Sequence, residues 1–147
     1  MAVVDPEMEF SKGMEALNSG DSLAALVHFE KAVQAGESPL AKSYYAYCIA
    51  RERGQVQKGI ALCHEAMAQE PDNARHYLNL GRIYLTTRNK VEALRVWREG
   101  MGVEHDPEIA ALLEEIGSRK PPVISSLHRD NPINKYLGMI LSKLGLR

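Results

Sequence analysis

Apolar residues recur along most of the chain with the spacing of amphipathic helices, and the pattern repeats in units of fixed length. Residues 34 positions apart are similar in kind over three successive units. The clearest series are Ala25, Gly59 and Ala93; Leu26, Ile60 and Leu94; and Phe29, Cys63 and Trp97. Self-similarity at a fixed period of this size is typical of repeat architectures. Within each unit the apolar spacing predicts helices.

Turn-forming residues divide each unit into two helices. Gly20 and Gly54 fall inside the first two units, and prolines fall near the unit boundaries. Asp72 and Asp106 stand where a side-chain oxygen caps the first amides of a following helix. The predicted helices cover residues 6–18 and 22–35, 39–53 and 56–69, and 73–87 and 90–102.

The third unit carries a recognisable motif. It contains Tyr77, Leu80, Gly81 and Tyr84 on its first helix, then Ala93 and Trp97 on its second. This spacing resembles the signature of the tetratricopeptide-repeat (TPR) family. The resemblance implies an all-α, right-handed α-solenoid of three helical hairpins. The units fall at about 6–39, 40–73 and 74–107, and a capping helix at 107–118 closes an array of residues 6–118.

The resemblance also implies which residues meet inside each hairpin. Family members place small residues where the two backbones approach most closely, which pairs Gly13 with Ala25 and Gly81 with Ala93. In the second unit the bulky Tyr47 then faces Gly59, so Gly59→Val is expected to overpack the contact. On the capping helix we expect Ile109 to face the array and Glu108 to face away from it.

The end of the sequence predicts a separate segment. Residues 119–130 contain consecutive prolines and are expected to form an extended linker. Residues 131–147 predict an amphipathic helix with an apolar stripe of Ile133, Tyr136, Leu137, Ile140, Leu141 and Leu144. Residues 1–118 carry a formal charge of −6 and residues 119–147 carry +5. We favour a helix that folds back on its own array or pairs with a second copy as a homodimer; the alternative is docking on a membrane surface.

Composition and motifs argue against catalysis. The five histidines are scattered without metal-ligand spacing, and the two cysteines form no CxxC pair. Cys63 occupies the core position that Phe29 and Trp97 fill in the other units. We therefore expect no enzyme activity, cofactor or metal. The near-neutral net charge of −1 argues against a nucleic-acid partner,. With no leader-like segment or long apolar run, a cytoplasmic location is expected.

The resemblance implies a protein partner. In the family, the first helices of the hairpins line a concave groove that holds a peptide or helix. The residues expected to line it here are Phe10, Met14, Tyr44, Cys48, Arg51, Arg75, Leu78, Asn79 and Arg82; the alternative for the apolar members is packing between helices. Arginines at one end suit an acidic segment. The carboxylate clamp of chaperone-binding members is not matched, because Phe10, Met14, Tyr45 and Asn79 stand at its positions and only Arg75 resembles a member.

An apolar tail and an apolar groove on one chain suggest that the tail competes with the partner. Deletion of residues 121–147 is then expected to increase the affinity for the partner. Titration of the full and the shortened chain with the partner segment measures the difference. Unchanged or weaker binding by the shortened chain would contradict the competition.

Overall fold

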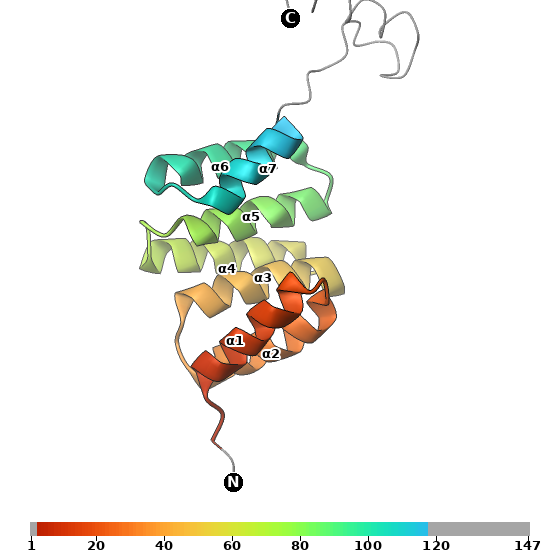
Figure 1. The fold of residues 1–147 in the computed structure, drawn as a ribbon, viewed down its shortest axis with the longest axis vertical. Coiled ribbons are helices and arrows are strands. Elements are labelled where there is room, and N and C mark those ends of the chain that lie inside the picture. The colour runs from red at the N-terminus through yellow and green to blue at the C-terminus, as the bar shows by residue number, and fades with distance from the viewer. Residues whose placement is uncertain (1–2, 118–147) are drawn as a thin grey trace, which may run out of the picture. The chain divides into compact units, whose positions relative to one another are not determined.

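The computed structural model describes residues 3–117, and within them it contains seven helices and no strand (Figure 1). The first six form three hairpins: α1 (Pro6–Asn18) with α2 (Ser22–Ala35), α3 (Pro39–Arg53) with α4 (Val56–Gln69), and α5 (Ala74–Thr86) with α6 (Lys90–Val103). The last, α7, spans Pro107–Gly117. Every helix boundary lies within one residue of its predicted position. The expected all-α helical-repeat fold is confirmed.

All the described helices except α4 begin where a side-chain oxygen replaces the missing backbone partners of the first amides. Asp106 Oδ1 accepts hydrogen bonds from the amides of Glu108 and Ile109 at 2.9 and 3.1 Å, as expected. The expected cap at Asp72 is wrong, because Asn73 Oδ1 accepts the Arg75 amide at 3.0 Å. Asp72 lies one residue too early to reach the first turn of α5, whose N-cap is Asn73.

The three turns inside the hairpins each contain one residue with a positive φ angle. Gly20, Gly54 and Arg88 follow one another at the 34-residue period, and their φ angles are 85°, 66° and 61°. Glycine adopts this left-handed region without penalty, whereas arginine does so at a cost of about 1 kcal/mol. The repeat therefore preserves the conformation of the turn even where its glycine is absent.

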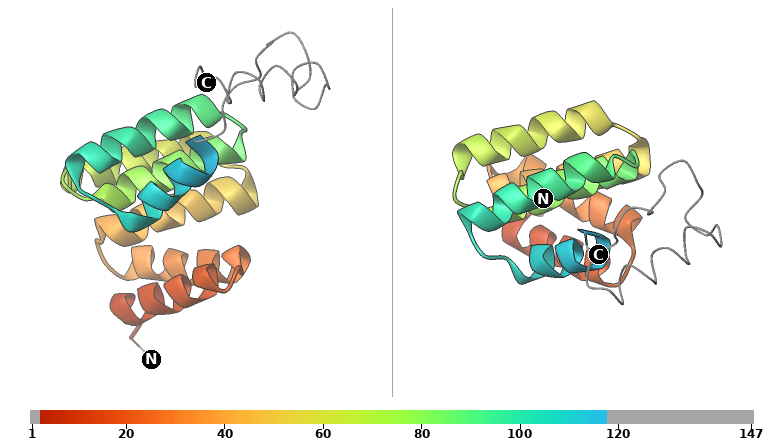
Figure 2. Two further views of the ribbon diagram at one scale, coloured as in Figure 1. Left: turned by 45° about the horizontal axis from the view of Figure 1, so that its top comes forward. Right: turned by 90° about the horizontal axis from the view of Figure 1, so that it is seen from above.

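Met1–Leu113 form one compact unit, and a second unit begins at Glu114. In the first unit, the three hairpins follow one another in sequence order (Figures 1 and 2). The central helix α3 packs against α2, α4 and α5. Residues 43–50 of α3 are consecutively buried, so this helix has no solvent-facing stripe over that length.

Aromatic side chains join the first hairpin to the second. Phe10, Phe29 and Tyr44 come from α1, α2 and α3, and their ring centroids lie 5.5 to 5.8 Å apart. Pairs at this separation and tilt contribute beyond their buried area. Cys63 and Trp97, which follow Phe29 at the repeat period, are fully buried as expected.

Helix α7 spans the residues of the predicted capping helix, and its Ile109 is fully buried. The predicted linker 119–130 and amphipathic helix 131–147, with all six residues of its apolar stripe, lie outside the described residues. None of the helices within residues 3–117 is both long and apolar enough to cross a membrane.

The expected contacts of the close-approach glycines are wrong in detail. The Phe29 and Trp97 rings, rather than Ala25 and Ala93, occupy the space in front of Gly13 and Gly81. The second hairpin differs because Cys63 stands where those rings stand, and there the backbone itself approaches. A Cβ atom added at Gly59 would lie 2.8 Å from the Ala46 carbonyl oxygen, with Tyr47 not among its nearest neighbours.

We expect Gly59→Val to lower the free energy of unfolding by about 1 to 3 kcal/mol, because the helix backbones would have to move apart. Gly102→Val is the matched control, since the space in front of Gly102 is open within 4 Å. Denaturant unfolding of both variants measures the difference. Equal stability of the two variants would show that α3 and α4 can separate without penalty.

Candidate binding groove

Three adjoining clefts form one groove along α1, α3, α5 and the start of α7. Their volumes are about 390, 160 and 210 Å³. The first two share Met14, Asn18, Tyr44 and Glu108, and the last two share Tyr47, Arg51 and Arg82. Of the residues predicted to line a groove, six do so: Phe10, Met14, Tyr44, Arg51, Arg75 and Arg82.

Three other predicted groove residues are placed in the core instead. Cys48, Leu78 and Asn79 are fully buried, so they cannot touch a partner in this conformation. The repeat period identifies equivalent positions, but a neighbouring hairpin covers part of each first helix, as α3 and α5 cover each other. Asn79 donates to Ser43 of α3 across that contact, and the expectation that these three buried residues line the groove is corrected accordingly.

Sequence reasoning missed other residues of the groove wall. Leu40 contributes to the first cleft, Tyr47 to the second and third, and Glu108 to the first and second. Tyr47 was recognisable as an unusually bulky residue at a position where the repeat expects a small one. Glu108 was expected to face away from the array, and this expectation is wrong because the carboxylate faces the arginines of α5.

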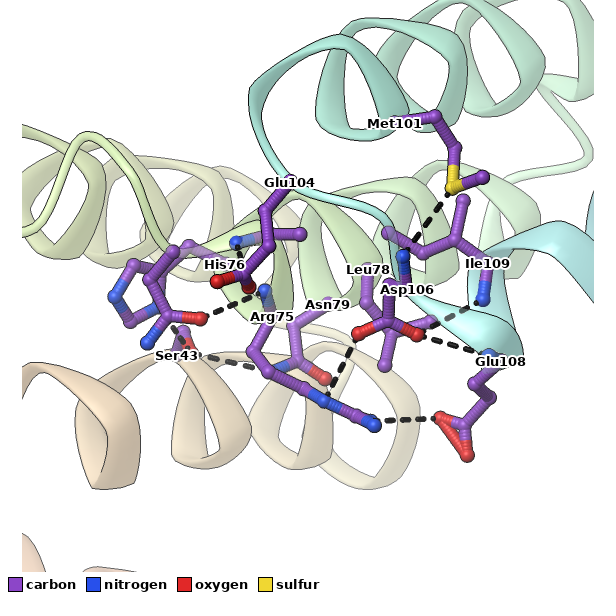
Figure 3. A network of polar contacts seen from close by, with 12 residues as sticks. Ser43, Arg75, His76, Leu78, Asn79, Met101, Glu104, Asp106, Glu108 and Ile109 are labelled. Carbon is purple, nitrogen blue, oxygen red and sulfur yellow. Dashed lines mark hydrogen bonds and ion pairs between the residues drawn. The ribbon is translucent and has the colours of Figure 1, made fainter.

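Arg75 lies at the centre of a charged cluster (Figure 3). Its Nε is 3.1 Å from Asp106 Oδ2, and its Nη1 is 3.1 Å from Glu108 Oε2 and donates to the Tyr44 hydroxyl at 3.2 Å. Burial raises the pKa of Tyr44, which therefore remains a neutral phenol. Partial burial lowers the pKa of Arg75, but the Tyr44 contact and the Asp106 and Glu108 carboxylates together outweigh it, so the pKa is raised.

Tyr47 organises the other two arginines. Its hydroxyl accepts a hydrogen bond from Arg51 Nη1 at 3.0 Å, and the Arg82 guanidinium lies over its ring at 5.4 Å from the centroid. Such a cation–π contact holds an arginine while leaving its N–H groups free to donate. Arg82 Nη2 uses this freedom to contact Glu108 Oε2 at 2.8 Å. The Arg51 side chain is 54% exposed, and the nearest carboxylate, that of Glu52, is 3.7 Å away.

A buried polar network lies behind the groove and joins the second hairpin to the third (Figure 3). Ser43 Oγ lies 2.8 Å from His76 Nδ1 and accepts a hydrogen bond from Asn79 Nδ2 at 3.1 Å. His76 Nε2 lies 2.9 Å from Glu70 Oε1. A carboxylate requires a donor, so the neutral ring carries its proton on Nε2 and Nδ1 accepts from Ser43.

The Ser43, His76 and Glu70 side chains form a chain of hydrogen bonds, but this arrangement does not favour catalysis. Ser43 and His76 are fully buried, and none of the clefts described above includes them. Burial also raises the pKa of both cysteine thiols, Cys48 and Cys63, to about 12, which removes the reactive thiolate at neutral pH,. Within residues 3–117, no cluster of three or more His, Cys, Asp or Glu side chains could hold a metal ion.

Comparison with known proteins agrees with the repeat geometry. A tetratricopeptide-repeat family model matches residues 50–116. No curated protein matches the chain. Among solved structures, it is similar to the first TPR of Spaghetti (RPAP3) bound to the HSP90 peptide SRMEEVD. The identity is 18%, the match covers 80% of this chain and 97% of that chain, and the TM-score is 0.57, which shows a shared fold.

We expect acid to weaken the junction between the second and third hairpins. Burial lowers the pKa of His76 below its ordinary value of about 6.5,. The unfolded chain therefore binds the proton first, and stability falls as the pH drops below about 6.5, by at most about 1.4 kcal/mol per pH unit. Denaturant unfolding at pH 7.5, 6.5 and 5.5 measures this loss. In His76→Gln the loss should be smaller, and an identical pH profile for both proteins would rule out His76 as its source.

Proposed function

We propose that the chain, whose residues 50–116 match a tetratricopeptide-repeat family model, is a non-catalytic interaction module that binds a segment of another protein in its groove. The observation that carries the proposal is the groove itself. It is apolar at Phe10, Met14 and Leu40 and cationic at Arg51 and Arg82, and it runs along α1, α3 and α5. A continuous surface of this kind fits an extended peptide or a helix.

The composition of the groove defines the segment that it would hold. Apolar side chains of the partner would anchor on the end formed by α1, where Phe10 and Met14 are half-buried. A carboxylate would bind at the arginine end, where guanidinium groups form paired hydrogen bonds to carboxylate oxygens. We therefore propose a segment with apolar anchors and an acidic residue as the ligand.

The likeness to the HSP90-peptide-bound TPR of RPAP3 supports a peptide as the ligand class, but it does not extend to the same peptide. Of the positions that would form the chaperone clamp, Asn79 is buried and donates to Ser43. Phe10 and Met14 supply apolar contacts where that clamp needs polar ones. The peptide SRMEEVD is therefore a specificity control, and we expect it to bind more weakly than a selected ligand.

A second candidate function rests on the sequence of residues 131–147, whose apolar stripe and basic charge suit self-association or a membrane surface,. Co-sedimentation of the full chain with vesicles that contain anionic lipid tests membrane binding, and sedimentation of the full chain alone tests self-association. Binding or dimerisation that is lost on deletion of residues 131–147 would favour this candidate.

Selection from a phage-displayed library of random 12-residue peptides tests the groove directly. We expect enrichment of peptides with apolar anchors and an acidic residue. Binding of a selected peptide should weaken by at least about tenfold in Met14→Glu, since a charge would enter the apolar end of the groove. Calorimetric titration measures the affinities.

The matched control is Leu23→Glu, which introduces the same charge on α2 at a side chain that is 60% exposed and absent from the clefts. This variant should bind like the unmodified chain. No enrichment of peptides, or equal weakening by both substitutions, would contradict the groove as the binding surface.

A further inference from the structure

Glu108 occupies the position where the arginine end of the groove would hold a carboxylate from a partner. We propose that Arg75 and Arg82 form a carboxylate-binding site that Glu108 fills in the free protein, and that an incoming carboxylate binds there by displacing Glu108. The inference rests on the proposed function of the groove and identifies the place and the competitor of the partner's acidic group.

The contacts of Glu108 are those of a ligand held by one atom. Arg75 Nη1 and Arg82 Nη2 both approach the same oxygen, Oε2, at 3.1 and 2.8 Å. Its side chain is 41% exposed, so the carboxylate can rotate into water at little cost of desolvation. A free carboxylate could approach the two guanidinium groups with both oxygens, which is the stronger arrangement.

The two arginines keep their other contacts if Glu108 leaves. Arg75 retains the Asp106 carboxylate at 3.1 Å and the Tyr44 hydroxyl at 3.2 Å. Arg82 retains its position over the Tyr47 ring. Because these contacts preorganise both guanidinium groups, the site would not have to be assembled when a ligand arrives.

The clefts on both sides of Glu108 give a ligand access to this position. Glu108 and Tyr44 line both the 390 Å³ cleft at the apolar end and the 160 Å³ cleft toward Arg51. A segment anchored on Phe10 and Met14 would therefore run beside the Glu108 carboxylate where it meets Arg75 and Arg82.

Glu108 also balances the charge of the site. Arg51, Arg75 and Arg82 stand against the carboxylates of Glu52, Asp106 and Glu108. A carboxylate added without displacement would meet a like charge close by, whereas removal of Glu108 leaves one positive charge uncompensated. Loss of this carboxylate should therefore strengthen the binding of an external one.

Succinate, a small dicarboxylate, is the probe that tests this site without any protein partner. Titration at constant ionic strength, followed by the Nε–Hε NMR signals of the arginines in the full chain, gives its affinity. We expect Glu108→Gln to bind succinate about tenfold more tightly than the unmodified chain, through Arg75 and Arg82. The double variant Glu108→Gln with Arg82→Gln should lose this gain.

Glu99→Gln is the matched control, because Glu99 is likewise an exposed glutamate that contacts an arginine, Arg95, on α6. It removes the same charge and should leave succinate affinity unchanged. Equal effects of Glu99→Gln and Glu108→Gln, or a gain that persists without Arg82, would overturn the proposal. Because succinate binding requires no peptide, failure of the peptide selection with a succinate gain in Glu108→Gln would count against the proposed function alone.

A thermal melt tests whether the Glu108→Gln variant remains folded. If Glu108→Gln melted well below the Glu99→Gln control, the shorter substitution Glu108→Ser would be titrated below its own melting range. The same tightening is expected there, because it too removes the internal carboxylate. Two folded variants without any gain in succinate affinity would overturn the proposal.

Discussion

The burial of α3 on every side is the constraint on which the rest of the first unit depends. A helix with eight consecutive buried residues, 43–50, cannot be covered by one partner helix. It requires the hairpin before it and the hairpin after it, as expected for a repeat array in which each unit covers its neighbour. Polar atoms on such a helix must find partners inside the protein. Ser43 and Tyr44 find them on α5, and Tyr47 finds one on α3 itself.

This constraint also shapes the arginine end of the groove. Tyr44 and Tyr47 bury their rings against the core and direct their hydroxyl groups to Arg75 and Arg51. The same aromatic residues that complete the interior therefore fix the cations at the surface. Side chains fixed in advance lose little conformational freedom when they bind, so an array of this construction suits recognition of a flexible segment.

Local features of the sequence were sufficient to predict the helices, because periodicity, turn glycines and capping residues act within a few positions. Side-chain partners across repeats were harder to predict. The 34-residue period placed Leu78 and Asn79 on the correct helix but could not show how much of its surface the preceding hairpin covers. Glu108 meets Arg75 across 33 positions, and a pattern of local amphipathicity assigns that charge to solvent. Likewise, the burial of the polar Ser43 side chain is explained only by its contact with His76, which lies in another repeat.

The turn at Arg88 connects backbone strain with the recognition surface. Arg88 takes the left-handed conformation that Gly20 and Gly54 adopt in the other hairpins. It closely follows Leu85 and Thr86, which line the last cleft beside Tyr47 and Arg82. The third hairpin could therefore be stabilised further by a single substitution at the edge of its groove. A lineage that acquired glycine at position 88 would have a higher free energy of unfolding. It could then tolerate destabilising substitutions among the side chains that determine which ligand binds.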